Sequence, residues 1–224
     1  MATDLPHLLL TVLPFALASM VSPLTIIIVM AVLSATKRRA LKAVLFAVTY
    51  ATVFSAICLL LVAVGSAATI GGTPSSAIAG IDVLLGIILL YIAGRSLTKG
   101  VGTPLVRSFD PDAMSVADAV SLGVLFSASN FSSLIPALAA SKDIGVAAVP
   151  PFDKTIAFVF LLAIALSWVW APVVIYLVTP NNFDRLLDPV IRFLRRYGGQ
   201  LMAAVLFLIG LYLIVRGVTG LAML

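Results

Sequence analysis

The fold is decided by residues 8–36, which read LLLTVLPFALASMVSPLTIIIVMAVLSAT and contain no charged side chain. A helix needs about 20 mainly apolar residues to cross a bilayer, so this run predicts a membrane span. The whole chain has the same character, because 62% of its 224 residues are hydrophobic and only 10% are charged. Soluble domains average about 25% charged residues, so the composition predicts an integral membrane protein.

Charged residues and one turn-rich segment divide the chain into six predicted spans. The charge-free run 43–81 is too long for a single helix, and the Gly-, Pro- and Ser-rich residues 71–76 divide it. The predicted spans are residues 8–36, 43–66, 78–98, 118–141, 155–179 and 199–219. This pattern predicts an all-α integral membrane protein of six transmembrane helices.

Two pairs of segments indicate an internal repeat. Residues 22–25 (SPLT) align with 129–132 (SNFS), and residues 90–95 (LYIAGR) align with 211–216 (LYLIVR). We interpret residues 1–100 as a first three-helix repeat, 101–117 as a cytoplasmic linker and 118–224 as a second repeat. Three spans are an odd number, so the second copy is expected to be inverted in the membrane. Inverted repeats are typical of secondary transporters, whose sites lie between the copies near the midplane.

The positive charges are distributed unevenly between the two ends of the predicted spans. All but three of the fourteen Lys and Arg residues fall at one side, at positions 37–42, 95–107 and 185–196. By the positive-inside rule that side is cytoplasmic, which places both termini outside a bacterial inner membrane. The remaining three, Lys142, Lys154 and Arg216, are expected at the outer side.

The candidate substrate-binding residues surround two predicted helix breaks. Pro23 lies near the middle of the first span and should break it, because proline lacks the amide hydrogen and clashes with the preceding turn. The matching stretch of the fourth span is rich in serine and contains Asn130, with Pro136 further on. The candidates are Ser19, Ser22, Pro23, Thr25, Thr49, Thr52, Ser129, Asn130, Ser132 and Ser133. Packing kinks with hydroxyls bonded to their own helices are the alternative interpretation.

The sequence lacks the residues that several classes of function require. The chain has no catalytic triad, metal-ligand cluster or Gly-rich phosphate loop, so we expect no enzyme, cofactor or metal. The basic residues lack interleaved aromatics, which argues against nucleic-acid binding.

No ionisable residue is predicted at the centre of a span, and Asp82 is expected to reach the interface from the end of the third span. Residues 183–197 are predicted to form an amphipathic helix on the cytoplasmic surface, or else a plain connector.

Three motifs resemble a known family. They are residues 18–27 (ASMVSPLTII), residues 37–41 (KRRAL) and residues 126–131 (FSASNF). Together they resemble the GAP-like, or sulfolipid-addressing (Sap, SfLAP), proteins of actinobacteria, which belong to the lysine exporter superfamily of six-span proteins. The fourth span departs from the family pattern, in which Pro often follows Asn, since Phe131 follows Asn130 here. The resemblance implies export of cell-envelope glycolipids or their precursors.

We therefore expect a transporter of envelope lipids, with membrane lipids and a glycolipid or other small amphipathic molecule as partners. Two alternatives stay open at this point. One is an exporter of amino acids or other small solutes. The other is a non-transporting subunit of a lipid synthesis or export complex. A homodimer is compatible with each of these interpretations.

Overall fold

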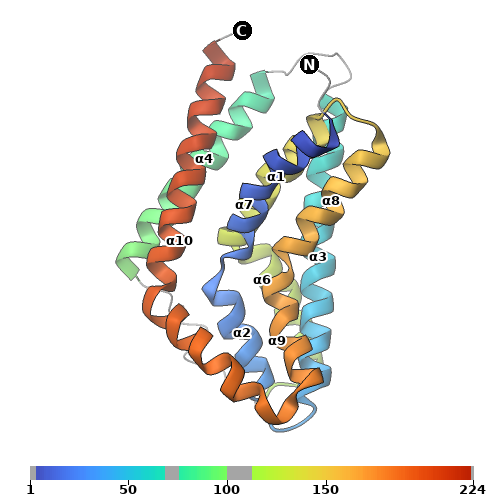
Figure 1. Ribbon diagram of the computed structural model, residues 1–224, viewed down its shortest axis with the longest axis vertical. Coiled ribbons are helices and arrows are strands. Elements are labelled where there is room, and N and C mark those ends of the chain that lie inside the picture. The colour runs from blue at the N-terminus through green and yellow to red at the C-terminus, as the bar shows by residue number, and fades with distance from the viewer. Residues whose placement is uncertain (1–3, 69–75, 100–112, 223–224) are drawn as a thin grey trace.

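The computed structural model describes residues 4–68, 76–99 and 113–222, and within these ranges all regular structure is helical. Figure 1 shows the helices as a long bundle with both termini at the same end. The elements are α1 (Leu5–Met20), α2 (Pro23–Leu33), α3 (Arg39–Ala68), α4 (Ser76–Lys99), α6 (Val116–Ser129), α7 (Phe131–Val146), α8 (Pro151–Ala165), α9 (Ser167–Val178), the short 3₁₀ helix η1 (Pro180–Asn182) and α10 (Phe183–Ala222).

The α3, α4 and α10 helices each contain an unbroken stretch that is long and apolar enough to cross a membrane. Three further pairs pass the same test together but are bent, by 50° for α1–α2, 61° for α6–α7 and 60° for α8–α9. Counting each bent pair as one span gives six, and each pair runs from one end of the bundle toward the other (Figure 1). The predicted all-α membrane fold is thereby confirmed, with three clear spans and up to six.

The first two breaks fall where the sequence predicts them. Ser22 adopts an extended backbone and Pro23 is the first residue of α2, where a missing amide hydrogen costs nothing. The second break lies at Asn130, which ends α6 and precedes α7, whereas Pro136 lies inside α7. The polar residue and not the proline therefore sets the position of the second break.

The third break was not predicted, because residues 155–179 read as one apolar run. It lies at Leu166, between α8 and α9. The Ser167 hydroxyl donates to the Ile164 carbonyl at 2.7 Å, a local bond that competes with the regular helical pattern. The α3 helix, by contrast, is unbroken from Arg39 to Ala68.

Close helix contacts depend on glycine. A Cβ added at Gly86 of α4 would lie 2.7 Å from the Gly210 carbonyl oxygen of α10, and one added at Gly210 would lie 2.9 Å from the Gly86 oxygen. Such small residues let helix backbones approach closely in lipid, where the hydrophobic effect does not drive association. The α4 and α10 helices consequently form a tight pair, which stands to one side of the other helices in Figure 1.

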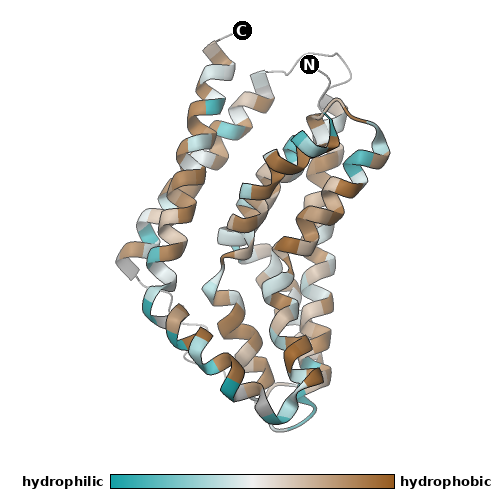
Figure 2. Ribbon diagram, viewed as in Figure 1, coloured by the Kyte–Doolittle hydropathy of each residue, from teal (hydrophilic) through white to brown (hydrophobic). Residues whose placement is uncertain are grey.

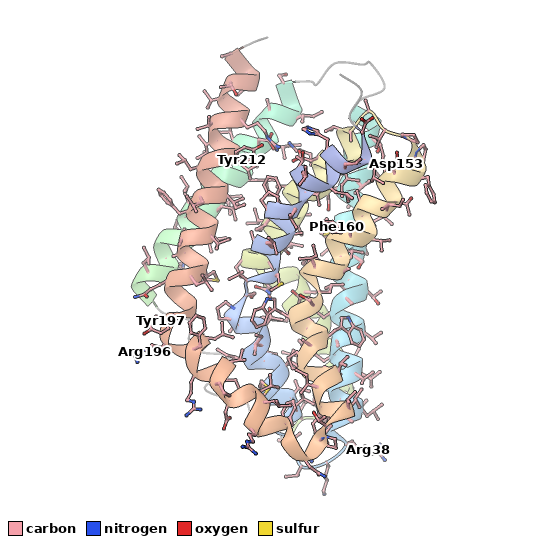
Figure 3. The ribbon with its side chains drawn as sticks, in the orientation of Figure 1. Arg38, Asp153, Phe160, Arg196, Tyr197 and Tyr212 are labelled. Atoms are coloured by element: carbon pink, nitrogen blue, oxygen red, sulfur yellow. The ribbon has the colours of Figure 1, made fainter. Side chains whose placement is uncertain are left out.

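The last helix differs from its prediction in one respect. The expected surface helix 183–197 and the expected span 199–219 form one continuous helix, α10, because neither Pro189 nor the Gly198–Gly199 pair interrupts it. The amphipathic pattern itself is confirmed, since Leu187 and Leu194 are buried while Arg192 and Arg196 are exposed. Figure 2 shows hydrophobic residues along most of the bundle, and Figure 3 labels Arg38 and Arg196 toward its lower end.

Candidate functional site

The breaks in the α1–α2 and α6–α7 pairs meet inside the bundle. The Ser22 hydroxyl oxygen lies 3.3 Å from both Oδ1 and Nδ2 of Asn130, although these residues are 108 positions apart in the chain. The Ser19 hydroxyl donates to the Ser133 carbonyl at 2.7 Å, which joins the end of α1 to the first turn of α7. The two breaks are therefore held together by direct hydrogen bonds.

Asn130 is the centre of this network, which we call the polar cluster and which comprises Ser19, Ser22, Thr25, Tyr50, Asn130, Ser132 and Ser133. Its Oδ1 accepts from the Ser132 hydroxyl at 2.9 Å. Its Nδ2 lies 2.9 Å from the Thr25 hydroxyl, 3.2 Å from the Tyr50 hydroxyl and 3.3 Å from the Ser133 hydroxyl. An amide nitrogen has only two hydrogens, so these acceptors and Ser22 share them. The network can therefore exchange partners without leaving the amide unbonded.

The polar cluster is buried among apolar and aromatic side chains. Asn130 is 4% exposed, and Ser19, Ser22, Thr25 and Ser133 are also buried. Tyr50 packs against the rings of Phe54 and Phe126, with centroids 5.8 and 6.0 Å away. A polar group in such surroundings is costly unless it is hydrogen-bonded, which explains why the cluster is so densely paired.

The same site lies at the N-terminal ends of two half-helices. Helix α2 begins at Pro23, next to Ser22, and helix α7 begins at Phe131, next to Asn130. The N-terminal end of a helix carries a partial positive charge from its aligned peptide dipoles. The C-terminal ends of α1 and α6 adjoin the same breaks and carry the opposite partial charge, so the cluster combines uncharged donors and acceptors with helix ends of both signs.

The structure separates the ten predicted site residues into six in the polar cluster, one beside it and three elsewhere. Six belong to the polar cluster: Ser19, Ser22, Thr25, Asn130, Ser132 and Ser133. Pro23 is buried beside it, where its ring would meet any side chain added at Gly198. Tyr50 belongs to the cluster but was not among the candidates. The available signal was a polar hydroxyl within the charge-free predicted span 43–66.

The other three candidates do not join the cluster. The hydroxyls of Thr49, Thr52 and Ser129 donate to the carbonyls of Leu45, Val48 and Leu125, one turn back on their own helices. Thr52 and Ser129 are also exposed on the bundle surface. For these three residues the alternative interpretation, hydroxyls satisfied by their own helix, describes what the structure shows.

A second group of polar residues contradicts the expectation that the spans hold no buried ionisable groups. Asp82 of α4, Lys142 and Asp143 of α7 and Arg216 of α10 form what we call the ionic cluster. Asp82, Lys142 and Asp143 are only 4%, 3% and 8% exposed. Asp82 therefore bonds to side chains of α7 and α10 and is not exposed at the end of its span, and Lys142 lies within α7. Both lie near predicted span ends, and no local pattern of residues indicates that they meet.

Comparison with known proteins gives one match. A family model described as "Sap, sulfolipid-1-addressing protein" matches residues 12–219, nearly the whole chain. No curated protein and no solved structure matches this chain. The matched range includes both helix breaks, the polar cluster and the ionic cluster. The chain therefore belongs to the sulfolipid-1-addressing protein family, as its motifs indicated.

Proposed function

We propose that this protein exports an amphipathic cell-envelope lipid, such as a glycolipid or its precursor, across the inner membrane. The observation that carries the proposal is the polar cluster, a buried and uncharged hydrogen-bonding site between two broken helices of a membrane bundle. Broken helices at corresponding positions of two halves are where transporters bind substrate. The family description adds a lipid as the class of cargo.

The chemistry of the polar cluster suits a headgroup of sugar hydroxyls. Each serine, threonine and tyrosine hydroxyl can donate and accept, and the Asn130 amide does both through different atoms. A sugar hydroxyl has the same capacity, so it can replace these internal bonds one at a time. The acyl chains would stay among the exposed apolar side chains and the surrounding lipid.

The transport cycle we propose treats residues 1–100 and 118–224 as an inverted repeat whose broken spans hinge at the contact between Ser22 and Asn130, while α4 and α10 stay packed together. The break between α8 and α9 has no counterpart in α3, so one half has an additional bend. Movement of this half against the straight α3 would expose the polar cluster to the two leaflets in turn.

The proposed orientation places α10's exposed Arg192 and Arg196 at the cytoplasmic surface and both termini outside. The three basic residues assigned to the outer side support this orientation, since each is engaged within the protein. Lys142 and Arg216 belong to the ionic cluster, and the Lys154 ammonium donates to the Gly145 carbonyl at 2.6 Å. Paired in this way, they oppose insertion less than free positive charges would.

The rival functions differ in what supports them. A non-transporting subunit needs no buried ionisable groups, whereas the ionic cluster provides them within the bundle. An exporter of small zwitterions could also use the helix ends and neutral polar groups at the two breaks, so the polar cluster alone does not exclude it. The family description names a lipid, and lipid export is therefore the function that the site and the family together support best.

The test is lipid analysis of a strain that lacks the protein, with surface-exposed and internal pools measured separately. We expect surface glycolipid to fall and internal glycolipid to rise. Complementation with Asn130→Leu should fail, whereas the matched control Thr52→Val, which removes an exposed hydroxyl bonded to its own helix, should restore export. Unchanged surface lipid with raised internal amino-acid pools would favour the small-solute exporter.

A further inference from the structure

Two lysines are almost completely buried in the part of the chain that the structure describes, Lys142 at 3% exposed and Lys42 at 4%. The charge of Lys142 is compensated, because its ammonium binds Asp82 and lies 3.1 Å from Asp143. Lys42 differs, since its ammonium has no hydrogen-bond or ion-pair partner among the described residues. The two buried lysines are therefore in opposite electrostatic situations.

Lys42 lies in the first turn of α3, at the end of the bundle that we propose to be cytoplasmic. Helix α3 begins at Arg39, and its first turn contains no acidic residue. Helical side chains lean toward the N-terminal end of their helix, so the Lys42 ammonium lies toward the turn between α2 and α3. Arg38 in that turn is labelled toward the lower end of the bundle in Figure 3. The unpaired charge is therefore near the membrane surface but covered by protein.

The N-terminal end of α6 lies at the same level as that of α3. A Cβ added at Gly123 of α6 would lie 2.8 Å from the Phe46 carbonyl oxygen, and the first residue of each helix lies seven residues before this contact. Further along, a Cβ added at Gly145 of α7 would lie 3.0 Å from the Gly65 Cα, so the two chain segments run in the same direction. Both helices thus begin side by side, and each beginning carries a partial positive charge.

The carboxylate in the first turn of α6 does not compensate Lys42. Asp118 is exposed, and its Oδ2 accepts from the Ser115 amide at 2.8 Å, while the Ser115 hydroxyl accepts from the Asp118 amide at 3.1 Å. This reciprocal pair of bonds caps α6 itself. Negative charge from the described residues is therefore absent where the two helices begin and Lys42 is buried.

More positive charge surrounds the same place. Lys37, Arg38 and Arg39 are exposed, and the Arg39 guanidinium lies 4.9 Å from the centre of the Tyr176 ring at the end of α9. These three exposed cations are enough to orient the chain by the positive-inside rule, so orientation does not require a fourth that is buried. A buried charge is unfavourable unless it is paired, and the arrangement therefore calls for a negative partner from outside the chain.

We propose that Lys42 anchors a binding site for an oxyanion, namely the phosphate of an anionic lipid headgroup in the adjacent leaflet. The ammonium would donate charge-assisted hydrogen bonds to the phosphate oxygens, and the N-terminal ends of α3 and α6 favour the same charge. The exposed Lys37 and Arg38 would attract anionic headgroups to this end of the bundle. This lipid is a resident ligand, distinct from the cargo that we assign to the polar cluster. A soluble phosphate compound has the same chemistry, and the experiment separates the two sources.

The experiment measures thermal unfolding of the delipidated protein in a nonionic detergent. Three additives are compared, which are phosphatidylglycerol, phosphatidylcholine with the same acyl chains, and glycerol phosphate. We expect phosphatidylglycerol to raise the Tm, because it binds the folded state, and phosphatidylcholine to raise it much less. An equal rise with glycerol phosphate would support the site and identify a soluble phosphate as its source. Equal effects of the two lipids, with no effect of glycerol phosphate, would overturn the proposal.

Two lysine variants test the assignment to Lys42. Lys42→Met keeps the length of the side chain and removes the unpaired charge, so it should raise the Tm without lipid. It should also need about tenfold more phosphatidylglycerol for half of the remaining shift, the loss expected for one charge-assisted hydrogen bond. The matched control is Lys37→Met, an exposed lysine in the preceding turn, which should respond like the parent.

The two variants also define the results that contradict the site. A Lys42→Met protein with the parent's response to phosphatidylglycerol would overturn the proposal, and so would a Lys37→Met protein with an equal loss of response. If Lys42→Met does not fold, the comparison of phosphatidylglycerol, phosphatidylcholine and glycerol phosphate on the parent still decides. None of these measurements involves export, so their outcome is independent of the proposed function.

Discussion

The polar cluster and the ionic cluster lie at opposite ends of the same helix, α7, and they hold the bundle together in different ways. The polar cluster consists of neutral groups that share an excess of acceptors around one amide, so single bonds can break while others replace them. The ionic cluster has balanced charges, and the loss of one of them leaves another uncompensated. The difference indicates that the polar cluster can exchange single bonds with a ligand. The ionic cluster, in contrast, is stable only when all four of its charges are present.

The largest effect is expected from breaking the balance of the ionic cluster. Lys142→Met should lower the free energy of unfolding by about 3–5 kcal/mol, because two carboxylates then share one cation in a dry environment. Thermal or denaturant unfolding in detergent measures the loss. Adding Asp82→Asn to this variant restores neutrality and should recover a large part of the stability. A double variant no more stable than Lys142→Met would show that charge balance is not what matters.

A smaller loss of stability is expected when the polar cluster is disrupted. Asn130→Leu leaves the hydroxyls of Ser22, Thr25, Tyr50 and Ser133 without their shared partner, at a cost of about 1–3 kcal/mol, and it should abolish export. The matched control is Ser129→Ala, whose exposed hydroxyl bonds to its own helix, and we expect a change within about 0.5 kcal/mol. Equal effects from the two neighbouring substitutions would contradict the central role of Asn130.

A substitution at the contact between α4 and α10 should lower the free energy of unfolding by a similar or smaller amount. Gly86→Ala places a methyl group 2.7 Å from both the Gly210 carbonyl oxygen and the Ile214 side chain, and overpacking of this kind costs about 1–3 kcal/mol. Gly94→Ala on the same helix meets no atom within 4 Å and should be neutral or slightly stabilising. Unfolding of both variants in the same detergent makes the comparison. A stable Gly86→Ala protein would mean that the pair is not held by this close approach.

The smallest effect on stability is expected at Pro23. Its replacement by alanine keeps the first turn of α2 compatible with a helix, so the stability change should stay below about 1 kcal/mol. Export should fall nevertheless, because α1 and α2 can then merge into a straighter helix and move Ser22 away from Asn130. Accumulation of folded protein and surface lipid are measured on the same cells. Normal export by this variant would show that the network, without the proline, maintains the break.

Local sequence was sufficient for the features that depend on neighbouring residues. The apolar runs predict the helices, Pro23 predicts the first break, and the spacing of Leu187, Leu194, Arg192 and Arg196 predicts the amphipathic part of α10. The alignment of Ser22 with the region of Asn130 also predicted that the two breaks belong to one site. These properties follow from hydropathy, backbone geometry and helical periodicity, which a stretch of sequence carries by itself.

Only the tertiary structure decided which polar groups meet. Thr49 and Ser129 resemble the cluster residues in sequence, yet their hydroxyls bond to their own helices. Asp82, Lys142, Asp143 and Arg216 look like the ends of separate spans, yet they form one buried network. The reason is physical: a charge within a span is tolerable only beside its partner, and that partner comes from a distant part of the chain. Helix rotation and the bends at Asn130 and Leu166 determine these distances, and no single stretch of sequence encodes them.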